Sequence, residues 1–180
     1  MSTTAIKTDI RDEVLRALKD ALVFAVQPDD TGETISEDAI VIQKTSTKAD
    51  RSHAKSGQLQ DYPGLIVSMP RQTAIPPGEG ENNSDMWHYQ TLIQLIDRDL
   101  WDVENRLATW DKWVEQIASY FNFNDLTAGS VDLASKVTWA LCTARQVTDI
   151  DEKAWVKHSN FIAGVLLETQ CLQHRGVIAQ

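Results

Sequence analysis

Two different spacings of apolar residues follow each other directly in the middle of this chain. Residues 86–97 have a period of two, which places Trp87, Tyr89, Ile93 and Leu95 on one face and His88, Gln90 and Gln94 on the other. This alternation predicts a strand with one buried face. Residues 100–121 then carry an apolar side chain at every third or fourth position, which predicts an amphipathic helix. A chain that buries both features folds as a layer of helices packed on a sheet.

The rest of the chain contributes one more helix and further strands. Residues 9–26 repeat the helical spacing, with Asp9 as the expected N-cap and Pro28 just beyond the end. Short apolar or β-branched runs predict strands at residues 39–47, 62–71, 136–150 and 160–172. Strands that follow each other in sequence favour antiparallel pairing. We therefore expect a single α+β domain over residues 1–180, with a mostly antiparallel sheet of about five strands packed against two main helices.

Proline and glycine set the expected limits of the strands. Pro70 is expected to close the strand at 62–71, because proline cannot donate a hydrogen bond to a sheet. Residues 71–85 are rich in prolines, glycines, asparagines and acids, and they predict a long protruding loop between two strands. In the strand at 136–150, one face is expected to carry Val137, Trp139, Leu141 and Val147.

Composition and charge argue against some classes of function and location. The formal net charge is -9, so the chain lacks the excess of Lys and Arg with which proteins grip nucleic-acid phosphates. An acidic surface can still let DNA slide past it, because like charges repel. No run of about 18 apolar residues is present, and charged residues come early at the N-terminus. We therefore expect a soluble protein made in the cytosol, with no membrane partner.

The two cysteines, Cys142 and Cys171, are too few and too far apart in sequence for a metal cluster or a disulfide framework. A protein of the cytosol keeps such thiols reduced. We expect both to be buried as small apolar side chains.

One group of residues has the composition of a metal site. Asp85, His88, Asp97, Asp99 and Asp102 supply oxygen and nitrogen ligands near the predicted corner between strand and helix, where a divalent ion for hydrolysis could be held. Ordinary structural roles explain them better, because a turn and a helix N-cap favour aspartate. No phosphate loop, HExxH, CxxC pair or GxSxG elbow is present. We expect no enzyme, metal or cofactor, and keep a small metal-dependent hydrolase as the alternative.

Tryptophans on the second predicted helix suggest a contact between subunits. Trp110 falls on the apolar stripe of that helix, whereas Trp101 and Trp113 fall toward its edges. Large aromatic side chains at such edges are common anchors of protein interfaces. Trp101 and Trp113 are therefore interface candidates.

Several segments together resemble the tail terminator and neck-region proteins of long-tailed bacteriophages. The resemblance spans residues 62–176 and is one of pattern, carried in order by YPGLIVSMPR, an acidic loop, HYQTLIQLIDRD, the helix ENRLATWDKWVEQIASYF and LLETQCLQHRG. It implies a mostly antiparallel sheet packed against helices. It also implies a homo-oligomeric ring, typically a hexamer, that caps the tail tube, ends its polymerisation and joins the tail to the head.

The resemblance further implies partners and a location. The partners are other copies of the chain, the tail tube protein and a head-side connector or stopper protein, while DNA passes through the channel without specific binding. The ring belongs to the virion neck and is assembled in the host cytoplasm. Residues 71–85 become an assembly loop, with Glu79, Glu81 and Asp85 as its charges. The region 28–61 is longer than a compact terminator needs, so a head-completion or stopper protein, or an acidic adaptor of another kind, stays open.

Overall fold

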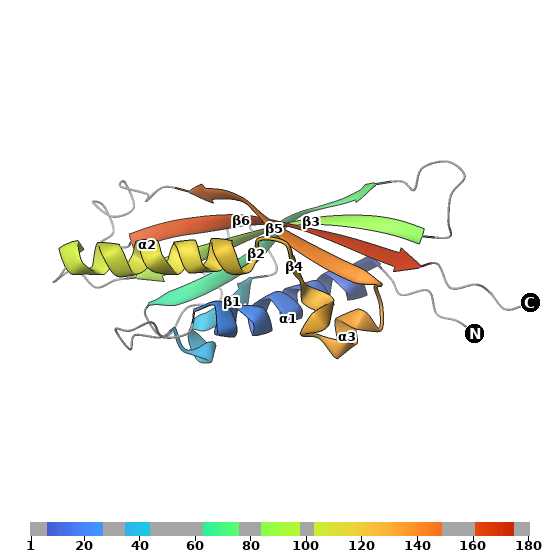
Figure 1. The fold of residues 1–180 in the computed structure, drawn as a ribbon, viewed down its shortest axis with the longest axis horizontal. Helices are drawn as coiled ribbons and strands as arrows, with labels where there is room; N and C mark the ends of the chain where they lie inside the picture. The colour runs from blue at the N-terminus through green and yellow to red at the C-terminus, as the bar shows by residue number, and fades with distance from the viewer. Residues whose placement is uncertain are drawn as a thin grey trace, which may run out of the picture.

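A computed structural model of the chain describes residues 7–26, 35–43, 63–75, 84–97, 103–148 and 161–174. The described part contains one sheet of six strands (Figure 1) in the order β1-β2-β3-β6-β5-β4. The strands are β1 (Ile40–Gln43), β2 (Gly64–Ile75), β3 (Ser84–Asp97), β4 (Asn124–Asp125), β5 (Trp139–Thr148) and β6 (Phe161–His174). The helices are α1 (Lys7–Ala25), α2 (Val103–Tyr120) and the short α3 (Val131–Ala134). The α+β fold predicted from the sequence is thereby confirmed.

The pairing of the strands is mixed. β2 with β3, β3 with β6, β6 with β5 and β5 with β4 are antiparallel, whereas β1 runs parallel to β2. The central pair is β3 and β6, which are in register along their whole length from Ser84 opposite His174 to Asp97 opposite Phe161. The antiparallel core of the prediction is correct, and the parallel edge strand β1 was not expected.

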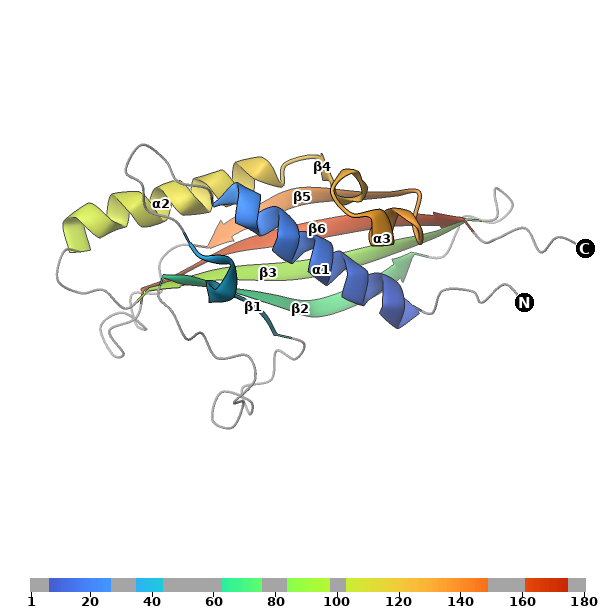
Figure 2. The same cartoon turned by 90° about the horizontal axis from the view of Figure 1, so that it is seen from below.

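The described helices all cover the same face of the sheet (Figure 2), where α1 crosses the strands diagonally and α2 lies toward the β5 side. The apolar stripe of α1 and the odd-numbered apolar side chains of β3 belong to one buried core, as the spacing on each element predicts. The core residues on these elements include Ile10, Val14, Leu18, Leu22, Tyr89, Ile93 and Leu95. Each such side chain contributes about 1.5–3 kcal/mol when it is fully buried. The opposite face of the sheet carries none of the described helices (Figure 1), and we call it the open face.

Two strands contain a bulge, and both strands differ from the prediction. β2 does not close at Pro70 but continues to Ile75, with an irregularity between Ser68 and Arg71 that accommodates the proline without breaking the strand. β5 has a similar irregularity between Ala144 and Gln146. A bulge changes which side chains share a face, so one alternation could not hold across it.

The face assigned to β5 was wrong already in residues 139–142, before this bulge. Ala140 and Cys142 are fully buried on the helix side, whereas Trp139 and Leu141 are half-buried on the open face. The expected loop at 71–85 is also wrong at both ends, since residues 71–75 belong to β2 and residues 84–85 to β3. Its remaining part, residues 76–83, lies outside the described residues.

Two aspartates have local roles that differ from the prediction. Asp9 lies inside α1, which already includes Lys7, so it is not the N-cap. Asp125 accepts hydrogen bonds at Oδ1 from the backbone N–H of Thr127 and of Ala140, both over 3.0 Å. These bonds fix the chain between α2 and β5, where the sequence predicted only a loop.

Candidate assembly surfaces

Asp97 occupies the core and not the exposed turn that was expected. It is only 1% exposed, at the last position of β3 on the helix side. Its Oδ2 accepts a hydrogen bond of 2.8 Å from the indole Nε1 of Trp110, which is equally buried on α2. A buried carboxylate needs such donors, because leaving it without them would be costly. Asp97 therefore ties the end of the central strand to α2.

The proposed metal ligands do not come together in the part of the chain that the structure describes. Asp85 and Asp97 lie on the helix side of β3, whereas His88 is on the open face, because successive side chains of a strand point to opposite sides. Asp99 and Asp102 fall outside the described residues. Within the described ranges, no three His, Cys, Asp or Glu side chains are close enough to share a metal ion.

His88 takes part instead in a charged cluster on the open face. Its Nδ1 lies 3.3 Å from Oε1 of Glu168 on β6, and Oε2 of the same carboxylate accepts a bond of 2.5 Å from Nε of Arg145 on β5. The cluster thus connects three neighbouring strands. The carboxylate of Glu168 is paired with the guanidinium of Arg145. The cluster adds little net charge to the face.

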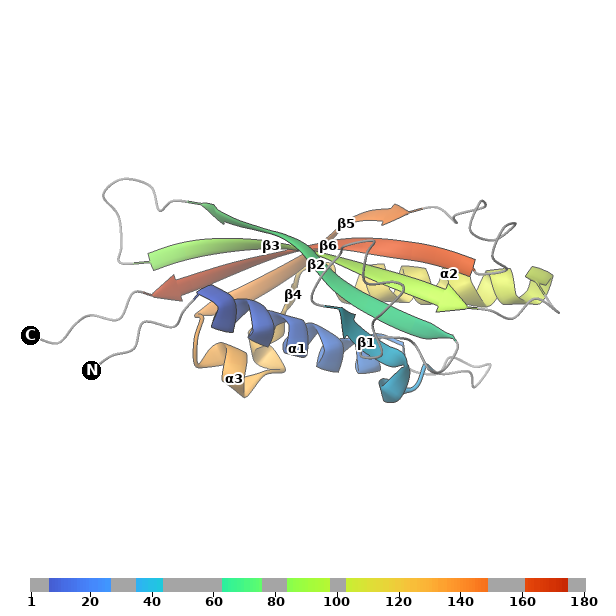
Figure 3. The same ribbon diagram turned by 180° about the vertical axis from the view of Figure 1, so that it is seen from behind.

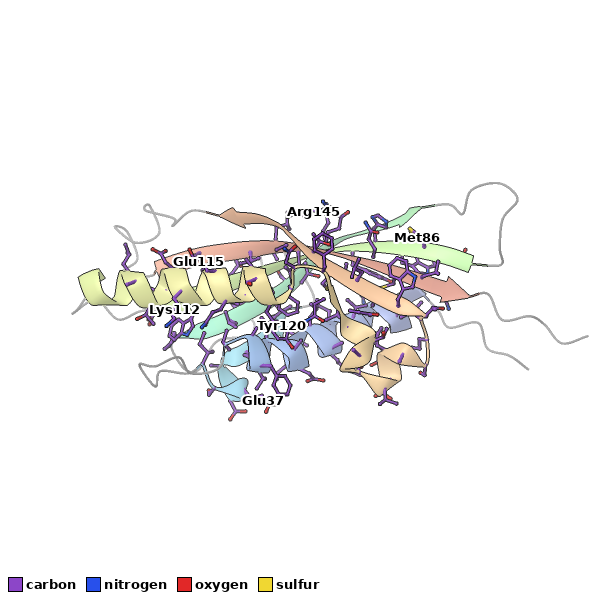
Figure 4. The ribbon with its side chains drawn as sticks, in the orientation of Figure 1. Glu37, Met86, Lys112, Glu115, Tyr120 and Arg145 are labelled. Carbon is purple, nitrogen blue, oxygen red and sulfur yellow. The ribbon has the colours of Figure 1, made fainter. Side chains whose placement is uncertain are left out.

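Apolar side chains surround this cluster on the open face. One row across the sheet consists of Met86, Leu172 and Trp139, and another pairs Leu92 with Leu166. All of these side chains are half-buried. Figure 4 shows Met86 and Arg145 on the upper side of the sheet, while Glu37, Lys112, Glu115 and Tyr120 lie on the helix side. Most of the described acidic residues lie in the helical layer, so the open face is the less charged side of the molecule.

β2 and β5 are each covered on their outer side along only part of their length. β1 pairs with residues 65–68 of β2, and β4 pairs with residues 141–142 of β5. The outer side of residues 69–75 and that of residues 143–148 face no strand within the described part of the chain. Figure 3 shows β1 beside one end of β2 while the rest of β2 runs on beyond it. We call these two stretches the free edges.

The two free edges lie at opposite sides and opposite ends of the sheet. The register places Ile75, Met86, Leu172 and Trp139 across one end. It places Ile66, Gln94, Gly164 and Thr148 across the other end. β2 and β5 also run in opposite directions, because three antiparallel pairings separate them. Unpaired strand edges of this kind are templates for pairing with another chain.

The interface candidates from the sequence occupy different positions in the structure. Trp113 is 3% exposed and belongs to the core, so its expected place at the edge of the helix is wrong. The helix is covered by both α1 and the sheet, which buries a wider stripe than one face predicts. Asp85 is half-buried on β3. Glu79, Glu81 and Trp101 lie outside the described residues.

Two exposed aromatic residues were not predicted as interface candidates. Phe123 is 69% exposed between α2 and β4, and Phe24 is 64% exposed on α1. Phe123 belongs to no periodic pattern, because it follows the end of a helix and precedes a strand of two residues. Its φ of 60° is unusual for phenylalanine, and this angle cannot be read from the sequence.

Comparisons with known proteins do not assign the chain to a family. No protein family model matches it. No curated protein has a significantly similar sequence. Among the described helices, none is both long enough and apolar enough to cross a membrane.

Proposed function

We propose that this chain is a structural subunit of the neck of a long-tailed bacteriophage, a tail terminator that forms a ring at the head-proximal end of the tail. The ring ends polymerisation of the tail tube and joins the tail to the head. The observation that carries the proposal is the pair of free edges, residues 69–75 of β2 and residues 143–148 of β5. They are different surfaces of one chain that can bind each other.

The two edges favour a ring over a closed pair. Subunits placed side by side in the same orientation bring β5 of one copy next to β2 of the next, in antiparallel direction. Each contact then joins two different patches, and such head-to-tail contacts generate rings when the rotation between subunits closes. Because the free edges lie at opposite ends, neighbours must also be staggered along the strands, as strands are when sheets close into barrels.

Both edges also carry a bulge, at residues 68–71 of β2 and at residues 144–146 of β5. Bulges discourage unselective pairing between sheet edges. A partner strand must match the interrupted register, which favours one specific neighbour over general aggregation. This selectivity suits a subunit that must associate with copies of itself and not with other exposed strands.

Charge supports the same arrangement. With a net charge of -9, copies of the chain repel each other over most of their surface. Contacts between copies are then favoured where acidic residues are few, as they are on the described part of the open face. The acidic remainder would let DNA traverse the channel of the ring without being held. The proposal assigns no catalytic role to the chain.

Native mass spectrometry and negative-stain imaging test the proposal. The purified chain is measured alone and again with tail tube protein that is polymerising. We expect closed rings, with a hexamer as the expected size, and tubes that stop growing at a capped end. A chain that stays monomeric both alone and with tube protein would contradict the proposal. Rings that bind the portal side of the head and ignore the tube end would assign the chain to the stopper position.

A further inference from the structure

Phe123 has a strained backbone that is not compensated by burial of its side chain. Its backbone has a φ of 60°, in the left-handed region that bulky L residues rarely occupy. Its side chain is 69% exposed, so burial of the ring gives little in return for that strain. Asparagine, which adopts the left-handed conformation more readily, stands on each side of it at Asn122 and Asn124. Strained backbone of this kind is a reason to look for a function.

The position of Phe123 in the sheet relates it to the free edge of β5. β4 pairs Asn124 with Cys142 and Asp125 with Leu141, so the next residue outward, Phe123, would stand opposite Thr143. The left-handed turn at Phe123 ends β4 at this point. The free edge of β5 therefore begins where Phe123 turns the chain away. A strand that paired with residues 143–148 would have the side chain of Phe123 beside one of its ends.

Contacts within the subunit account for the neighbours of Phe123 but not for its ring. Asn124 Nδ2 donates to the carbonyl oxygen of Tyr120, which helps to end α2. Phe121 is fully buried and packs edge to face against Tyr120. The ring of Phe123 points outward in a stretch of low charge, since Asp125 is the one ionisable group in residues 121–131 that is charged at neutral pH. That carboxylate is already occupied by bonds from Thr127 and Ala140.

We propose that Phe123 is an anchor for a second copy of this chain, which adds the free edge of its β2 to residues 143–148 and packs against the ring of Phe123. The occupant follows from three observations: the site continues into a free edge, the complementary free edge belongs to the same chain, and the surroundings carry little charge that would repel an acidic copy. The inference rests on the ring proposed above and names one residue that holds it together.

Two variants with matched chemistry test this anchor in the full chain. Phe123→Asn removes the ring and relieves the strained backbone, whereas Phe24→Gln removes a similarly exposed ring from α1. Self-association is measured by analytical ultracentrifugation, and subunit stability by thermal unfolding at low concentration. We expect Phe123→Asn to weaken association at least about tenfold, the loss that removing an interface anchor commonly causes, with an equal or higher midpoint of unfolding. Phe24→Gln should associate like the original chain.

The outcomes separate this inference from the proposed function. If the original chain never associates, the ring itself is wrong. If it associates and Phe123→Asn associates equally well, the ring stands and the anchor is wrong. Equal weakening by both variants would point to general surface hydrophobicity and would also overturn the anchor. A lower unfolding midpoint of Phe123→Asn would mean that Phe123 supports its own subunit, contrary to the inference. Phe123→Tyr, which keeps the ring, should retain association.

Discussion

The indole Nε1 of Trp110 and the carboxylate of Asp97 are joined by a buried hydrogen bond of 2.8 Å that fastens α2 to the end of the central strand. Bonds to charged groups contribute about 1.5–3 kcal/mol when one partner is removed. We expect Trp110→Phe to lower the free energy of unfolding in urea by about that amount. Trp139→Phe, on the half-buried open face, should cost clearly less. Equal losses for both variants would mean that ring volume matters and the bond does not.

Glu13 gives the stability of the subunit a dependence on pH. Its carboxylate accepts bonds from Lys136 Nζ at 2.8 Å and from Arg16 Nη1 at 3.0 Å, which connects α1 to the segment after α3. The bond with Lys136 is the main reason that the pKa of Glu13 is lowered from 4.5, against the opposing effect of burial. Because the folded pKa is depressed, this contribution is present above about pH 4.5 and is lost as pH falls through the lowered value.

Lys136→Met should therefore lower the free energy of unfolding at neutral pH and flatten its decline under acid. Urea titrations at neutral pH and below the unfolded pKa of Glu13 measure both effects. In a Glu13→Gln background the same substitution should cost much less, because the charged partner is already gone. An unchanged acid decline in Lys136→Met would show that Glu13 is not responsible for it.

The two thiols are expected to be unreactive while the subunit is folded. Cys142 and Cys171 are free and fully buried, as predicted from the sequence. Burial raises the pKa of Cys142 to about 12 and that of Cys171 also well above its usual range. Because the thiolate is the reactive species, a disulfide reagent at mildly alkaline pH should leave both untouched and label both after denaturation. A Phe24→Cys variant provides an exposed thiol as positive control. Rapid labelling of Cys142 in the native chain would contradict the burial.

Replacing residues 76–83 by a short link tests whether this segment is the assembly loop inferred from the sequence. β2 and β3 are already paired from Ile75 opposite Met86 onward, so a short glycine-containing link should leave the domain folded. We expect a normal thermal midpoint together with impaired ring formation or docking. Substituting Glu79 and Glu81 by glutamine within the full-length segment separates the effect of charge from that of length. Loss of folding, or normal assembly, would show that the segment has another role.

Much of the fold follows from local patterns, and what was missed depends on contacts distant in sequence. The alternation around Tyr89 and Ile93 and the spacing on α1 and α2 predict their elements because each has one buried face. The bulge near Pro70 interrupts the pattern of β2, so the length of that strand was predicted wrongly. On β5 the small side chains of Ala140 and Cys142 occupy the buried face, so the larger Trp139 and Leu141 indicated the wrong side. The burial of Asp97 depends on Trp110 across the core. An aspartate beside a predicted turn gives no sign of such a partner.

The candidate assembly surfaces were the least predictable part of the molecule. Which strand edges are free depends on how far β1 and β4 extend. Both are too short for their ends to be located from composition. Phe123 reads as an ordinary loop residue until its backbone angle and exposure are known.

Hydrogen–deuterium exchange at the free edges tests the proposed ring contact most directly. Amides of residues 69–75 and 143–148 are followed by mass spectrometry in dilute subunits and in the assembled form, with the amide of Ala140, already bonded to Asp125, as an internal reference. Pairing between neighbours predicts that both edges become protected together on assembly while the reference stays unchanged. An assembly in which both edges exchange as fast as in the dilute subunit would contradict ring formation by strand pairing.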